Sequence, residues 1–150
     1  MTPSTLPTQR VGVVGIIDPD AYTAATYTSG WIDAAAANSF MAIVMAGTLG
    51  ASATLDAKLE QASDSGGTGA KDITGKAITQ LTQAGTDSDK QAIISLTADE
   101  LDLANGFTHF RLSMTVATAT SDAGGIVLAM DHRYGPASDR DIAAVDEIVT

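Results

Sequence analysis

A strict alternation of apolar and polar residues in the middle of the chain limits the possible folds more than any other feature. Residues 53–60 read ATLDAKLE, so alanine and leucine alternate with polar or charged residues. Successive side chains of a β-strand point to opposite faces, so this segment predicts a half-buried strand with one face on a core and one in water. The glycine-rich sequence SGGTG at 65–69 predicts the turn that ends it.

Other segments with strand character extend this pattern along the chain. Further strands are predicted at 26–33, 40–49, 77–81, 91–97, 107–118 and 126–130, and the strand at 40–49 is expected to form a hairpin with 53–62. Thr97 with Glu100 three residues later matches a capping box and predicts one helical turn across an end of the domain. Seven or eight short strands favour an all-β fold, an antiparallel β-sandwich that is jelly-roll-like.

The two ends of the chain depart from this pattern. Residues 1–10 read MTPSTLPTQR and have no apolar period, which is typical of an extended arm. The apolar run VGVVGII at 11–17 is compatible with a strand of the sandwich or with a tail that docks on a neighbour. We assign 1–20 to an N-terminal arm, 21–136 to the β-sandwich domain and 137–150 to a C-terminal tail. Apolar residues at helical spacing in that tail predict a short amphipathic helix.

Charge and composition exclude several classes of function. The chain has 18 acidic and 8 basic residues, a formal net charge of −10 that repels phosphate backbones and argues against nucleic acid as a partner. It has no cysteine, which excludes disulfides and thiol catalysis. The apolar run at 11–17 is too short to span a bilayer, so neither a signal peptide nor a membrane partner is expected.

No constellation of residues predicts catalysis, a cofactor or a metal site. The two histidines, His109 and His132, lack a second and third ligand at metal-binding spacing, and we expect His109 on the solvent face of a strand. The sequence GGTGAK at 66–71 lacks the ending of a phosphate-binding loop and predicts a turn. Trp31 is expected to anchor the core rather than to form a ligand platform. The sequence therefore predicts a protein that is not an enzyme.

Several stretches of the sequence resemble a family of small virion structural proteins of tailed phages and prophages from alphaproteobacteria. The resembling segments are 25–33 (ATYTSGWID), 47–82 (from GTLGASATL to ITQLT), 96–102 (LTADELD), 107–118 (FTHFRLSMTVAT) and 131–136 (DHRYGP). The resemblance covers about residues 25–137 and leaves both ends open. It implies a component of the virion, with capsid decoration or cementing as its task.

That resemblance sets the expected partners and place of the protein. They are the major capsid protein and further copies of the chain, in a homo-oligomer such as a trimer, on the capsid exterior after synthesis in the host cytoplasm. The residues expected to bind a partner are Val11, Val13, Val14, Ile16 and Ile17. Two alternatives are a subunit of the tail or neck, and a jelly-roll module that binds glycans. The second needs exposed aromatic residues, for which Trp31, Tyr22, Tyr27 and Tyr134 are the candidates.

Overall fold

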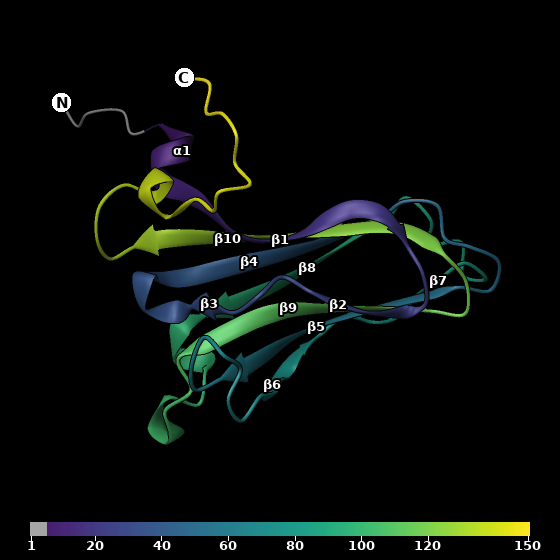
Figure 1. Ribbon diagram of the computed structural model, residues 1–150, viewed down its shortest axis with the longest axis horizontal. Coiled ribbons are helices and arrows are strands. Elements are labelled where there is room, and N and C mark those ends of the chain that lie inside the picture. The colour runs from purple at the N-terminus through teal and green to yellow at the C-terminus, as the bar shows by residue number, and fades with distance from the viewer. Residues whose placement is uncertain (1–5) are drawn as a thin grey trace.

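Two antiparallel sheets pack face to face in the computed structural model, which describes residues 6–150 (Figure 1). The β4 sheet has the strand order β1 (Val11–Tyr22), β10 (Ser121–His132), β4 (Ala37–Ala46) and β8 (Gln91–Thr97). The β5 sheet has the order β2 (Ala25–Thr28), β9 (His109–Ala117), β5 (Thr54–Ala62) and β6 (Lys71–Ala77). The short strands β3 (Ile32–Asp33) and β7 (Leu81–Thr82) extend it by pairing with β9 and β5. The short helices are α1 (Pro7–Arg10), η1 (Ala34–Ala36), η2 (Ala98–Glu100), η3 (Leu103–Asn105) and η4 (Ala137–Arg140).

The chain passes repeatedly from one sheet to the other. β1 is followed by β2 in the opposite sheet, β4 by β5, β8 by β9, and β9 by β10. The first long strand therefore lies beside the last, and Val11 is paired with Met130. This order of crossings is the jelly roll, which confirms the predicted all-β sandwich.

The core between the sheets is aliphatic with one aromatic pair. The predicted inward face of β9 is confirmed, because Phe110, Leu112, Met114 and Val116 are at most 1% exposed. The ring of Phe110 meets that of Phe40 from the opposite sheet, with 4.7 Å between their centroids and an edge-to-face tilt. In β5 the alternation also holds from Thr54 to Glu60, since its alanines and leucines are buried and its polar residues lie partly exposed on the other side, whereas Gln61 is buried.

The predicted hairpin between 40–49 and 53–62 is wrong. Both strands exist, but β4 and β5 belong to different sheets, and the connection crosses between the layers. The strand predicted at 26–33 is divided into β2 and β3, because Gly30 adopts a left-handed conformation with φ of 77°. The strand predicted at 77–81 instead runs from Lys71 to Ala77. The capping box is confirmed at η2, where the backbone N–H of Thr97 donates to the carboxylate of Glu100 over 2.8 Å.

The chain ends also differ from their predicted forms. Residues 11–20 lie within β1 of the β4 sheet, so of the two alternatives for this segment the structure has the intramolecular strand. Of the predicted arm, residues 1–5 lie outside the described residues and residues 7–10 form the single turn α1. The C-terminal tail forms one 3₁₀ turn, η4, and no helix follows it, so the amphipathic helix predicted there is absent. Helices this short are marginal without packing along their length.

Candidate interaction surface

The outward face of the β4 sheet is largely apolar over β1, β10 and β4, and β8 adds Ile93 among the polar residues Gln91, Ser95 and Thr97. The strand register places one isoleucine from each strand in a single row, namely Ile16, Ile126, Ile43 and Ile93. The adjoining row contains Val13, Leu128, Met41 and Ser95. Ile93 is 61% exposed and Met45, one row further, is 51% exposed. We call this surface, with Val11 and Met130 at one end and Met45 at the other, the apolar face.

The strands beneath the apolar face are apolar on both sides. β4 reads ANSFMAIVMA, in which buried Phe40, Ala42 and Val44 alternate with outward Met41, Ile43 and Met45. An antiparallel sheet with one face exposed to water normally alternates apolar and polar residues along each strand. Near-continuous apolar strands are typical of sheets that are covered on both faces. The sequence of this sheet is therefore suited to a state in which another surface covers it.

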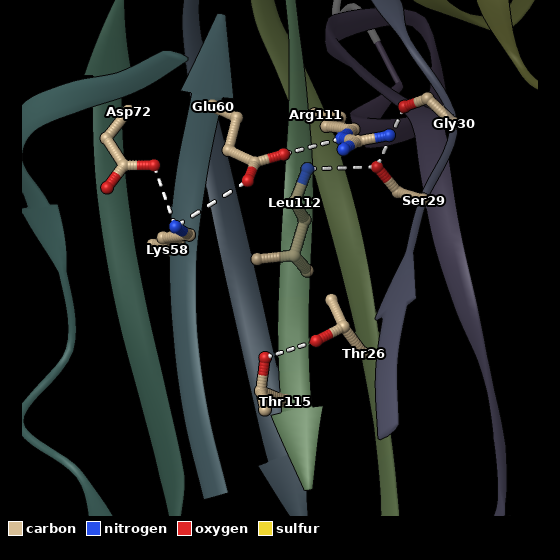
Figure 2. Close-up of polar contacts among 9 residues, drawn as sticks. All are labelled: Thr26, Ser29, Gly30, Lys58, Glu60, Asp72, Arg111, Leu112 and Thr115. Carbon is tan, nitrogen blue, oxygen red and sulfur yellow. Dashed lines mark hydrogen bonds and ion pairs between the residues drawn. The ribbon is translucent and has the colours of Figure 1, made fainter. Parts of the chain in front are cut away.

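The outward face of the β5 sheet has the opposite character (Figure 2). Lys58 forms ion pairs with Asp72 at 2.7 Å and with Glu60 at 3.6 Å, and Arg111 pairs with Glu60 at 2.7 Å. The hydrogen bond to Asp72, together with the two nearby carboxylates, raises the pKa of Lys58 although partial burial opposes it. This face is a hydrated network of charges and hydroxyls, so the two outer surfaces of the sandwich differ in kind.

The five residues predicted to bind a partner are divided between the two sides of β1. Val11, Val13 and Ile16 pair with outward residues of β10 and lie on the apolar face. Ile17 is 4% exposed in the core, and Val14 packs against the core at a register shift between Val13 and Gly15. The prediction did not include the larger apolar contribution of β4, β8 and β10. The near-continuous apolar runs in β4 and β10 are the signal that would have found it.

Hollows lie near both ends of the apolar face. One of about 670 Å³ is lined by Ile16, Met45 and Ile126, with Asp20 and Asp122 also in its wall. Gly124 also lines this hollow, and Pro19 packs closely over it, because a Cβ at that position would lie 3.0 Å from the Cα of Pro19. The other, of about 540 Å³, is lined by Arg10, Val11, Met130 and His132. The first hollow is apolar with a carboxylate rim, and the second contains both the guanidinium group of Arg10 and the carboxylate of Asp131.

The titratable residues do not gather into a chemical site. His109 lies on the outward side of the β5 sheet, where its Nδ1 is 2.9 Å from the hydroxyl of Thr108. His132 lies at the end of β10 in the other sheet, with its Nε2 3.0 Å from the carbonyl of Ala129. Among residues 6–150 no group of three or more His, Cys, Asp or Glu side chains is placed to hold a metal ion. No helix in this part of the chain is long and apolar enough to cross a membrane.

The four candidate aromatic residues do not form one platform. Trp31 is partly exposed beside the β5 sheet, where the Arg111 guanidinium lies 4.4 Å from its ring centroid, so its predicted role as a core anchor is wrong. Tyr22 and Tyr27 pack on each other with centroids 4.2 Å apart. Tyr134 is 68% exposed and follows the end of β10, whereas Tyr22 pairs with Ser121 at the start of that strand.

Comparison with known proteins identifies the fold. No protein-family model and no curated protein matches the sequence. The crystal structure of the infectious bursal disease virus VP2 subviral particle matches with a TM-score of 0.50 and 17% identity, over 82% of this chain and 32% of that one. The shared feature is the jelly-roll fold. The chain spans about a third of the length of the VP2 chains it matches.

Two other structures align over most of the chain with lower scores. A cowpea mosaic virus empty virus-like particle matches with a TM-score of 0.46 and 10% identity, over 91% of this chain and 87% of that one. The SPBc2 prophage-derived protein YomS matches with a TM-score of 0.43 and 10% identity, over 86% of this chain and all of YomS.

Proposed function

We propose that this chain is a non-enzymatic structural subunit of a bacteriophage virion, and specifically a capsid decoration or cement protein. The observation that carries the proposal is the pairing of a jelly-roll fold with an outer sheet face to which every strand contributes an outward isoleucine. A protein that works by assembly needs such a face. The resemblance of residues 25–137 to phage virion proteins supports the same conclusion independently of the structure.

The two faces of the sandwich fit the two surroundings of a decoration protein. The apolar face supplies area that is buried on assembly, and the charged face with Lys58, Glu60 and Arg111 is suited to water. Attachment at many equivalent positions on a shell multiplies weak single contacts into stable occupancy. The formal net charge of −10 gives a decoration protein no attraction for packaged DNA, as suits the capsid exterior.

The proposed partners are the major capsid protein and other copies of this chain. In the structure Val11, Val13 and Ile16 are the members of the predicted partner-binding set that are placed to take part, since they lie on the apolar face. Their contribution is side-chain burial rather than donation of a free strand, because their backbone is already paired with β10.

The number of copies per particle tests this proposal. Quantitative mass spectrometry of purified virions, with the major capsid protein as internal standard, is expected to give a ratio of the same order as the capsid subunits. About six or twelve copies per virion, the number expected for a ring, would instead indicate a subunit of the tail or neck. Complete absence from the particle would contradict a virion role altogether.

A further inference from the structure

We propose that the apolar face is occupied by a second copy of this chain, so that the β4 sheets of the two copies pack face to face. The two-fold axis of this dimer lies between those two β4 sheets and is perpendicular to their strands. This inference rests on the proposed function in treating the apolar face as an assembly surface, and it assigns that face to a second copy of the chain rather than to the capsid protein. In a two-fold dimer the same patch serves both subunits, so the patch must complement itself. Charge, shape and area of the face meet that condition.

One pair of charges at the two ends of the face is complementary. Asp20 and Asp122 line the hollow at one end, and the hollow at the other holds Arg10 together with Asp131, whose carboxylate accepts from the hydroxyl of Ser39 over 2.6 Å. Within the described part of the chain Arg10, Asp20 and Asp122 form no ion pair. An axis across the strands lays the start of β1 of one copy over the end of β1 of the other. Arg10 then faces Asp20 of the second copy, twice per dimer, whereas an axis along the strands would lay β1 over β8 and put the acidic ends of both copies on the same side.

The side chains of the face are complementary in the same arrangement. The axis exchanges the row of four isoleucines with the row that contains Leu128 and Met41. The row of Met130 is exchanged with the row of Gly124, so the methionine side chain of one copy lies over the 670 Å³ hollow that Ile16, Met45 and Ile126 line in the other. Methionine is suited to this because its unbranched side chain fills irregular apolar spaces.

The area is sufficient for a dimer. Four strands about 4.8 Å apart and about seven residues long at about 3.3 Å each outline a patch of roughly 19 by 23 Å, or roughly 440 Å². Two such patches cover roughly 900 Å² in projection, and a specific interface buries about 1,000 Å² or more. Relief of the side chains and the charged rim add to the projected area. Facing sheets pack with their strands aligned to within about 30°, which keeps the ends in register.

The edge of the sheet at β1 is less available to a second copy than its face. The C-terminal tail already pairs with β1, because the N–H of Val13 donates to Asp141 over 2.7 Å and its carbonyl accepts from the N–H of Ile142 over 2.9 Å. At the opposite edge the ammonium group of Lys76 donates to the carbonyl of Ser95 in β8 over 2.7 Å. Edges blunted in this way oppose edge-to-edge pairing and leave the face as the surface for association.

Sedimentation of the purified full-length chain tests the proposal. The wild type is expected to sediment as a dimer at micromolar concentration, and Ile43→Glu and Ile93→Glu are expected to be monomeric. Ile93 lies on an edge strand and is 61% exposed, so its substitution leaves the fold intact even if the substitution at Ile43 does not. Thr115→Glu, on the outward side of the β5 sheet, is the matched control and should remain dimeric.

Charge reversal tests the direction of the axis. Arg10→Glu is expected to raise the Kd of the dimer several-fold, and addition of Asp20→Arg to that variant is expected to restore it. The proposal is overturned if the wild type is still monomeric at a concentration 100-fold above the micromolar range. It is also overturned if Ile93→Glu leaves the dimer unaffected. A dimer whose Kd ignores both charge variants overturns the two-fold arrangement. In each case the number of copies per virion would still decide the proposed function separately.

Discussion

Replacing Phe110 by alanine is the sharpest test of the two-layer core. Phe110 lies in β9 at 0% exposure and meets Phe40 across the sandwich. Truncation of a buried phenylalanine costs about 3–5 kcal/mol, which includes the cavity left behind and the lost edge-to-face contact. For a chain of 150 residues this corresponds to a fall in Tm of roughly 6–20 °C. A domain stable by about 5–15 kcal/mol would lose a large part of its margin.

Phe107→Ala is the matched control for this measurement. Phe107 lies just before β9, partly exposed, with the Lys71 ammonium group 4.1 Å from its ring centroid. Loss of such an exposed contact costs about 0.5–1 kcal/mol. Urea unfolding followed by circular dichroism gives both free energies from one protocol. Equal costs for the two variants, or less than about 1 kcal/mol for Phe110→Ala, would refute the assignment of the β9 inner face to the core.

Two further substitutions test single contacts. Gly50→Ala is expected to destabilise the fold by about 1–3 kcal/mol, because the added Cβ would lie 2.3 Å from the backbone oxygen of Thr120; Gly66→Ala, in an open turn, should change stability far less. The hydrogen bond from Lys71, followed by that from Asn105, lowers the pKa of Asp102 below its usual 3.8. Stability from this carboxylate is therefore present above about pH 3.8 and is lost as the pH falls through the lower folded pKa. Asp102→Asn should lower Tm at pH 7, and the difference from the wild type should shrink as the pH falls below 3.8; a difference that stays constant with pH would contradict this cause.

The sequence was sufficient to predict most of the strands and the fold class, because both follow from local patterns. The alternation of 53–60 and the run FRLSMTVA each specify which side chains meet the core, and both are confirmed. The pairing of strands was not local. The adjacency of 40–49 and 53–62 suggested a hairpin, but sheets in a jelly roll are built from strands far apart in sequence, such as Val11 and Met130. Nothing within a single segment specifies such a partner.

The candidate surface was only partly predictable for the same reason. The apolar run at 11–17 pointed to a partner-binding segment, and three of its five residues lie on the apolar face. The other contributors come from β4, β8 and β10, which become neighbours only in the folded sheet. Each strand alone shows an apolar run that fits a buried strand. Only the shared register reveals that four isoleucines form one outward row.

The contrast between the two sheets separates a charged surface that is suited to water from the apolar face. Charged residues make up 17% of the chain, and those on strands are concentrated on the outer side of the β5 sheet and at strand ends. A net charge of −10 opposes random aggregation of monomers through the apolar face. Salt at physiological concentration screens that repulsion over a distance of about 8 Å. The hydrophobic stabilisation from burying the isoleucine row is not weakened by this screening. Association through the apolar face should therefore strengthen as ionic strength rises, until the Arg10–Asp20 pairs are themselves screened.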